Sequence, residues 1–69
     1  MPETTYEIRL KNALDEKWTT YFLPFTLIPD DEDTLLTGVV VDQAELFGIL
    51  LKIRDLGLYL ISVNPVSGK

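Results

Sequence analysis

Four consecutive acidic residues, Asp30 to Asp33 (DDED), have the type and spacing that most suggest a site for chemistry. Clustered carboxylates are ligands that Ca²⁺ and Mg²⁺ prefer. The run lacks the turn glycine and the distal bidentate glutamate of an EF-hand loop, and the sequence offers no second acidic cluster. Because Asp favours turns, we interpret the run as the solvated tip of a hairpin and predict no metal ion.

Groups suited to catalysis are scarce in this chain. It has no histidine and no cysteine, so it has neither an imidazole base nor a thiol nucleophile. Ser62 therefore has no histidine to activate it. Asp15 and Glu16 are adjacent in the sequence and offer no convergent acid–base geometry. We predict that the protein is not an enzyme and binds no cofactor.

Arg54 is the candidate contact for an anionic ligand, because a guanidinium group can bind a carboxylate or phosphate through two parallel hydrogen bonds. In the structural alternative, which we favour, Arg54 lies in the last turn of a helix and complements the negative end of its dipole. Lys52 and Asp55 then form an i, i+3 pair. Asp55 lies at the unfavourable end of that dipole, so we expect it to have a further partner.

Trp18, Tyr21 and Phe22 could form a stacking platform for a base or ring. Such platforms come with a cationic groove, and the 6 basic residues of this chain are spread thinly. The 11 acidic residues give a net charge of -5, which disfavours nucleic acid and anionic membranes. We therefore assign the three aromatic residues to the core and predict no nucleic-acid partner.

The N-terminal segment MPETTYEIRL lacks the basic region and apolar run of a signal peptide. No stretch approaches the roughly 20 apolar residues of a transmembrane helix. We predict a cytoplasmic protein without a membrane partner.

The hydrophobic periodicity, period 2 in strands and 3.6 in helices, predicts the elements that position these residues. They are a strand near 5–11, a helix near 14–22, strands near 25–29 and 34–41, a helix near 43–56 and a strand near 58–64. Asn12 or Asp15 is the candidate cap of the first helix. Pro29 indicates the end of a strand or an edge strand, and Pro65 is expected to close the last strand.

The helix near 43–56 has the clearest sequence signals. Asp42 and Glu45 have the spacing of a capping box, in which each side chain accepts from a backbone N–H at the helix start. Gly57 can take the left-handed conformation that ends helices. Between them runs an apolar stripe that must face a sheet: Leu46, Ile49, Leu50, Ile53 and Leu56.

The element order βαββαβ predicts a ferredoxin-like α+β fold, a four-stranded antiparallel sheet with two helices on one face. Residues 1–69 form a single domain, with an ordered core at about 5–65 and short flexible termini. The first and third strands are expected to be central. The third and fourth strands are apolar on both faces, and a strand of that kind expects cover on both sides.

A second protomer is the simplest cover for the sheet face that carries no helix. The candidates form alternating sets, and sequence leaves open which set faces the partner, because a one-residue shift in register exchanges them. They are Leu36 and Val40 or Leu35 and Val39 from the third strand, and Tyr59 and Ile61 or Leu58 and Leu60 from the fourth.

Phe47 and Leu51 lie on a flank of the second helix, away from its sheet-facing stripe. We expect them to pack against the first helix through Trp18 and Phe22, with a protein partner as the alternative.

The chain is short and has no disulfide to stabilise it. We predict a small acidic protein-interaction or oligomerisation module that forms a homodimer or binds a larger protein. The alternative is a small-molecule sensor resembling the ACT domains, which share this architecture and bind amino acids at subunit interfaces. ACT domains favour a glycine in the turn after the first strand, where this chain has Asn12.

The segment VVDQAELFGILLKIRDLGLYLISV resembles the C-terminal half of a group of small uncharacterised bacterial proteins. In that group a DQAxLxGxLxx(I/L)RDLGLxL(I/L)SV pattern recurs, and YEIRL and LDEKWTTYF are similar to its first strand and Trp-containing segment. Members often have histidine where this chain has Phe47. The resemblance covers Tyr6 to Val63 and implies a bacterial α+β protein, without an activity.

Overall fold

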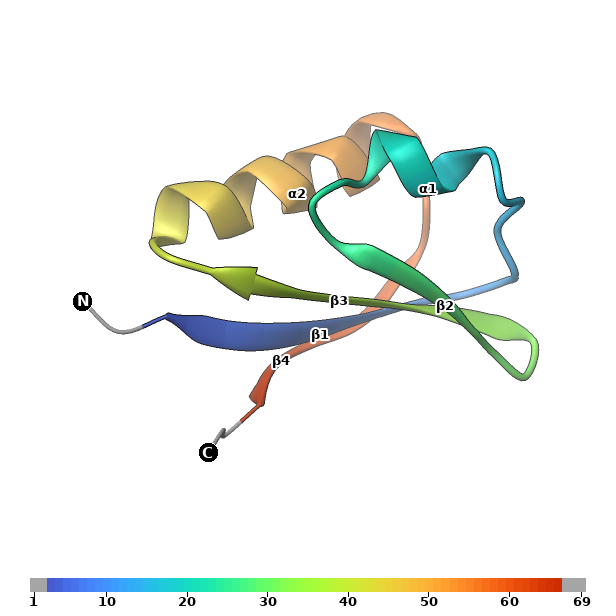
Figure 1. Cartoon of the computed structure of the whole chain (residues 1–69). Coiled ribbons are helices and arrows are strands. Elements are labelled where there is room, and N and C mark those ends of the chain that lie inside the picture. The colour runs from blue at the N-terminus through green and yellow to red at the C-terminus, as the bar shows by residue number, and fades with distance from the viewer. Residues whose placement is uncertain (1–2, 67–69) are drawn as a thin grey trace.

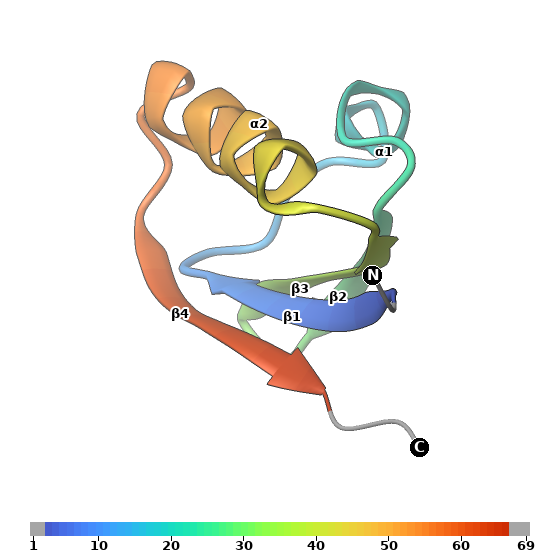
Figure 2. The same cartoon turned by 90° about the vertical axis from the view of Figure 1, so that its left-hand side faces the viewer.

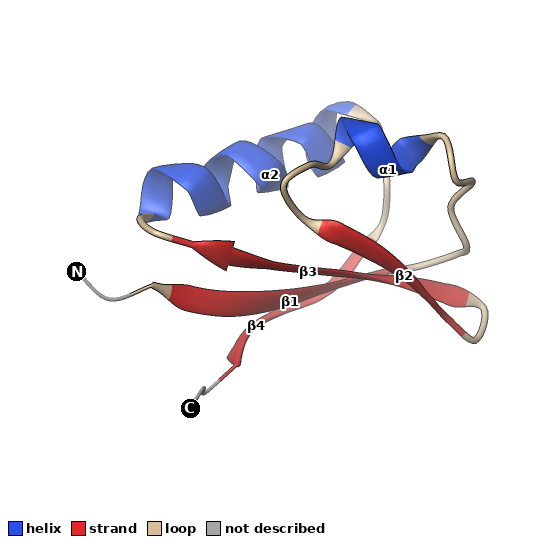
Figure 3. Ribbon diagram, in the orientation of Figure 1, coloured by secondary structure: helices blue, strands red, loops and turns tan. Residues whose placement is uncertain are grey.

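The computed structural model describes residues 3–66 and contains four strands and two helices (Figure 1). In chain order they are β1 (Thr4–Leu10), α1 (Trp18–Tyr21), β2 (Thr26–Asp30), β3 (Asp33–Val40), α2 (Gln43–Asp55) and β4 (Leu60–Val66). The predicted α+β class, with two helices and a four-stranded antiparallel sheet, is confirmed (Figure 3). The flexible termini predicted outside 5–65 concern mainly residues 1–2 and 67–69, which lie outside the described residues.

The strands form one antiparallel sheet in the order β2-β3-β1-β4. Both helices lie on the same side of this sheet, with α1 beside α2 (Figure 2). The register aligns Ile8 of β1 with Leu36 of β3 on one side and with Val63 of β4 on the other. These side chains point toward the helices and pack in the core. Among residues 3–66, no helix lies over the opposite face of the sheet.

α2 forms as its sequence signals predict. The carboxylate of Asp42 accepts a hydrogen bond from the backbone N–H of Glu45 at 3.0 Å, and the Glu45 side chain accepts one from Val41 N at 3.1 Å. Ile49 and Ile53 of the predicted stripe are buried against the sheet. Gly57 has φ 72, the left-handed conformation that turns the chain out of the helix.

α1 has only four residues, whereas the spacing predicts a helix near 14–22. The early part of the expected helix is held by the sheet instead. Leu14 N donates to Thr34 Oγ1 at 3.0 Å, and this hydroxyl donates to Asn12 O at 2.9 Å. Asn12 has φ 77, which no helix contains. The N-cap position is Lys17, and no side chain caps it. Of the two predicted caps, Asp15 lies just before the helix and its carboxylate accepts from Lys17 N at 3.4 Å.

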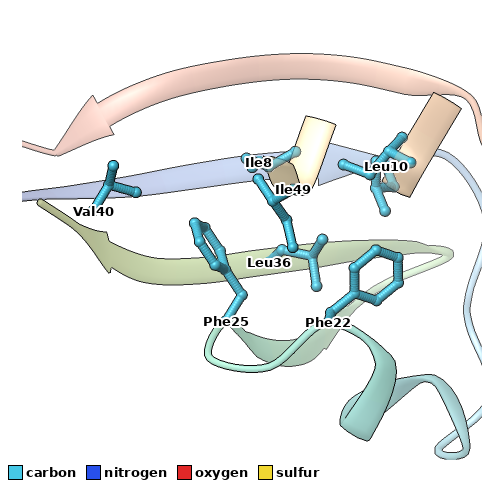
Figure 4. Packing of buried hydrophobic residues seen from close by; sticks show 8 residues of the cluster. Ile8, Leu10, Phe22, Phe25, Leu36, Val40 and Ile49 are labelled. Carbon is cyan, nitrogen blue, oxygen red and sulfur yellow. The ribbon is translucent and has the colours of Figure 1, made fainter. Parts of the chain in front are cut away.

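The core lies between the sheet and the two helices (Figure 4). Its buried members are Ile8, Leu10, Phe22, Phe25, Leu36, Val40, Ile49 and Ile53. Phe22 lies in the core as predicted, and Trp18 packs against it half-buried. The ring of Phe25 rests directly on Gly38, where an added Cβ would lie 2.8 Å from the ring carbon Cγ. The missing side chain of Gly38 therefore makes room for Phe25 on the inner face of β3.

The outer strands of the sheet, β2 and β4, each contain a proline. Pro29 is expected to mark either the end of a strand or an edge strand. It lies within β2, which is an edge strand, so the second expectation is confirmed. The expectation that Pro65 closes β4 is wrong, because the strand continues to Val66 and Pro65 pairs with Tyr6. An edge strand tolerates a residue without an N–H group, since one of its sides has no neighbour.

β4 begins two residues later than predicted, because its pairing with β1 is irregular near its start. The register shifts between Arg9 and Leu10, which face Ser62 and Leu60, so Ile61 is an extra residue. An insertion of this kind bends a strand and increases its twist.

Replacement of Gly38 by alanine tests the contact with Phe25. We expect Gly38→Ala to lower the free energy of unfolding by about 1–3 kcal/mol, the usual cost of overpacking a core. Urea unfolding measures it, and a double-mutant cycle with Phe25→Leu isolates the contact, since the smaller side chain leaves room for the methyl group. Equal costs of Gly38→Ala in both backgrounds would show that the ring does not limit this position.

The start of α2 gives a second stability test. We expect Asp42→Ala to cost about 1 kcal/mol, because it leaves the N–H of Glu45 without its acceptor. Asp42→Asn keeps a side-chain oxygen at the same place and serves as the matched control, with little expected loss. Thermal and urea unfolding of the two variants decide the matter, and identical stabilities would argue against the cap.

Candidate interaction surfaces

The open face of the sheet is the face that neither helix covers (Figure 1). Because side chains alternate along a strand, each strand sends every second residue to it. Its members are Thr5, Glu7 and Arg9 of β1, Thr26, Ile28 and Asp30 of β2, Leu35, Thr37 and Val39 of β3, and Ser62, Asn64 and Val66 of β4.

Leu36 and Val40 do not belong to the open face, and their prediction as interface residues is wrong. They are 0% and 4% exposed in the protomer's own core. The physical reason is Gly38, which lies on the same side of β3 and must face the helices to admit Phe25. The alternative set on this strand, Leu35 and Val39, points outward.

An apolar row runs along the hairpin on the open face. Ile28 of β2 and Leu35 of β3 are direct cross-strand partners, and Val39 lies further along β3. Ile28 is 39% exposed and Val39 is 49% exposed. Cross-strand apolar pairs stabilise a sheet. Apolar side chains that stay exposed to water, however, do not gain the stabilisation that burial would contribute. The row is therefore suited to burial against another apolar surface.

An ion pair borders the apolar row. Arg9 lies opposite Leu35, and its guanidinium group passes over β3 to donate to the carboxylate of Asp30 in β2. The hydrogen bond and the negative charge of Asp30 raise the pKa of Arg9 above its ordinary value. Both side chains are partly exposed, so the pair contributes little to stability. It orients the long Arg9 side chain across the sheet.

The acidic run forms the tip of the β2–β3 hairpin, as interpreted from the sequence. Asp31 has φ 56 in the turn, Asp30 pairs with Arg9, and Asp33 accepts from Asn12 N at 3.1 Å. The outer carboxylates of the run are thus engaged within the protein. Within residues 3–66, no group of three or more acidic side chains is arranged to hold a metal ion.

The outer face of α2 is the second exposed apolar surface. We define it by four residues on the side of the helix away from the sheet: Ala44, Phe47, Gly48 and Leu51. Phe47 is 55% exposed and Leu51 is 48% exposed. The expectation that α1 covers these two side chains is therefore not met. The alternative expectation, a protein partner, stays a prediction.

Lys52, rather than Phe47 or Leu51, joins α2 to α1. Its Nζ donates to Tyr21 O at 3.1 Å and lies 5.2 Å from the centre of the Tyr21 ring. Tyr21 in turn makes edge-to-face contacts with Trp18 and Phe22, at ring-centre distances of 5.8 and 5.4 Å. These three aromatic residues thus pack on one another, but Tyr21 is 41% exposed, so its assignment to the core is wrong.

Arg54, the candidate anion contact, pairs with its neighbour Asp55 at 3.1 Å. The two side chains are 74% and 63% exposed, so this is a solvated surface pair. The predicted Lys52–Asp55 pair does not form, because Lys52 turns toward Tyr21. The expected further partner of Asp55 is therefore Arg54. The structure brings no second cation to Arg54 among residues 3–66.

The fourth-strand candidates lie on the surface next to the start of β4. Tyr59 is 67% exposed and Ile61 is 45% exposed, while the alternative residue Leu60 is 41% exposed and Leu58 packs against the core. Lys11 Nζ lies 5.5 Å from the centre of the Tyr59 ring. These side chains are available to a partner, and whether they contact one stays a prediction.

Two shallow pockets of about 200 Å³ each flank α2. One lies at its N-terminus beside β1 and includes Tyr6 and Gln43. The other lies between α2 and the turn before β2, where Leu23 and Pro24 face Gly48.

Sequence reasoning missed Leu23, which is 56% exposed. It also missed Gly48, although the spacing of Ala44, Phe47, Gly48 and Leu51 signals a second helix face.

Within the described residues, no helix has the length and apolar character needed to cross a membrane. No curated protein and no solved structure matches this chain. A family model does match, over residues 5–64, and it describes a domain of unknown function. The chain therefore belongs to the family of that domain, DUF8691.

Proposed function

We propose that this protein is a non-enzymatic interaction module that acts by self-association through the open face of its sheet. The observation that carries the proposal is the apolar row of Ile28, Leu35 and Val39 on the open face, in which Ile28 and Val39 are exposed and Leu35 is half-buried. Monomeric soluble proteins rarely expose large contiguous apolar patches, and such patches mark interaction sites. A second protomer related by a two-fold axis would offer the same row in return.

The energetic argument depends on the small size of the chain. A domain of 69 residues buries a low fraction of its surface, and both helices are already used on one face of the sheet. Burying an aliphatic side chain contributes about 1.5–3 kcal/mol. Three such side chains from each of two protomers would offset a large part of the cost of association. The polar and charged residues of β1 and β4 would then form the rim.

The sensor alternative has less support. In an ACT-like site, the turn after the first strand would present free backbone groups to a ligand. Here the N–H groups of Asn12 and Leu14 already donate to Asp33 and Thr34. The turn is therefore closed by the protein's own side chains.

We infer a ferredoxin-like arrangement, for which the support is the element order, the strand order β2-β3-β1-β4 and the two helices on one side. A bacterial origin and a cytoplasmic location are inferences from the sequence alone. The family assignment is compatible with them and adds no activity.

A charge placed in the apolar row tests self-association. We expect the wild-type protein to have a mass above its 7.8 kDa chain mass at micromolar concentration, and Val39→Lys to lower that mass, because a buried unpaired charge is costly. Sedimentation equilibrium measures both. Val39→Ile keeps the row apolar and is the matched control. If wild-type and Val39→Lys proteins have the same mass, the open face is not the contact.

Thermal denaturation with the common amino acids tests the sensor alternative. A ligand at 100 times its Kd would add about 2.7 kcal/mol of stability to the folded protein. We expect no shift of the melting temperature from any of them. A reproducible rise with one amino acid would favour the sensor over the interaction module.

A further inference from the structure

The outer face of α2 alternates small and large residues in a way that fits a copy of itself. Ala44, Phe47, Gly48 and Leu51 are spaced i, i+3, i+4 and i+7, so they surround one hole on the helix surface. Nothing lies within 4 Å of the position that a Cβ of Gly48 would take. The hole is therefore open toward the outside, and α1 lies to one side of it (Figure 2).

We propose that α2 of one copy packs antiparallel against α2 of a second copy through this face. A two-fold axis between Phe47 and Gly48 places Leu51 of each copy against Ala44 of the other. It sets the two Gly48 residues opposite each other on one flank of the contact and the two Phe47 rings opposite each other on the other flank. Leu51 then meets the small Ala44 in both directions, and the two Gly48 residues leave room between the backbones, so the helices can approach closely. The proposal rests on the self-association proposed above and adds a second contact.

The charges on one flank of α2 favour the same arrangement. Glu45 and Lys52 are seven residues apart and lie on the same flank, the side on which Lys52 reaches Tyr21. An antiparallel pair keeps this flank on one side of both helices and reverses its direction. Glu45 of each copy then lies near Lys52 of the other. A parallel two-fold pair would instead place this flank of the two copies on opposite sides of the contact, so Glu45 and Lys52 of different copies would not meet.

The position of α2 makes this contact independent of the sheet contact. The outer face of α2 and the open face of the sheet point in opposite directions (Figure 2). One copy can therefore bind two others at the same time. Because α2 has only 13 residues, and is thus about 20 Å long, we expect the helix contact to be the weaker of the two.

Disulfide trapping tests the helix contact, since the chain has no cysteine of its own. Ala44→Cys and Leu51→Cys are made in separate proteins of different tag length, both with Val39→Lys to remove the sheet contact. In an antiparallel pair, residue 44 of one copy faces residue 51 of the other. We expect mild oxidation of the mixture to give mainly the mixed disulfide, and little dimer from either protein alone.

The outcomes separate this inference from the proposed function. Equal cross-linking within and between the two proteins, or none, overturns the antiparallel contact and leaves the outer face of α2 to a different occupant. If Val39→Lys lowers the mass measured by sedimentation equilibrium but no mixed disulfide forms, the sheet contact stands without the helix contact. If the mixed disulfide forms although Val39→Lys leaves the wild-type mass unchanged, the helix contact stands alone.

A filled hole provides a second, independent readout. Gly48→Gln replaces glycine by a better helix former, so the variant should fold at least as well as the wild type by circular dichroism and thermal unfolding. The longer side chain blocks the hole, and we expect it to lower the yield of the mixed disulfide at least tenfold. Gly48→Ala, which adds only a methyl group, should retain most of the yield. An undiminished yield with Gly48→Gln contradicts the proposed packing.

Discussion

Helices cover only one face of the β-sheet, and the other features of the molecule depend on that asymmetry. The two helices, one of them a single turn, meet the inner side of β1 and β3 and bury Ile8 and Leu36 completely. The outer side of the same strands receives no cover from the described chain. Leu35, Ile28 and Leu36 are all aliphatic, but they lie in different environments. Leu36 faces the helices, whereas Leu35 and Ile28 face the uncovered side of the sheet.

The predictability of each element follows from where its determinants lie. α2 was predictable because its cap, stripe and stop are local: Asp42 binds the N–H of Glu45, and Gly57 turns the chain. The length of α1 was not predictable, because Thr34, 20 residues away from Leu14, holds the chain that would have been its first turn. Such a competing hydrogen bond exists only once the sheet has formed.

The sequence predicted that one face of the sheet is exposed and apolar, but it did not show which residues of β3 form that face. The segment LLTGVVV is equally apolar on both faces, so hydrophobicity alone cannot orient β3. Gly38 and Phe25 decide it, through a contact between residues from different strands. The basic side chains are used inside the chain as well: Arg9 and Arg54 pair with acids. Three lysines lie over aromatic rings: Lys11, Lys17 and Lys52. The charges left facing water are predominantly acidic.

The prolines of the two edge strands limit how this sheet can grow. A strand added to either edge would need a continuous row of backbone partners, as in β-augmentation or in amyloid. Pro29 in β2 and Pro65 in β4 each lack an N–H group. Continuation of the sheet from one molecule into the next is thereby disfavoured at both ends. The molecule can in this way associate through its exposed apolar faces while its sheet remains four strands wide.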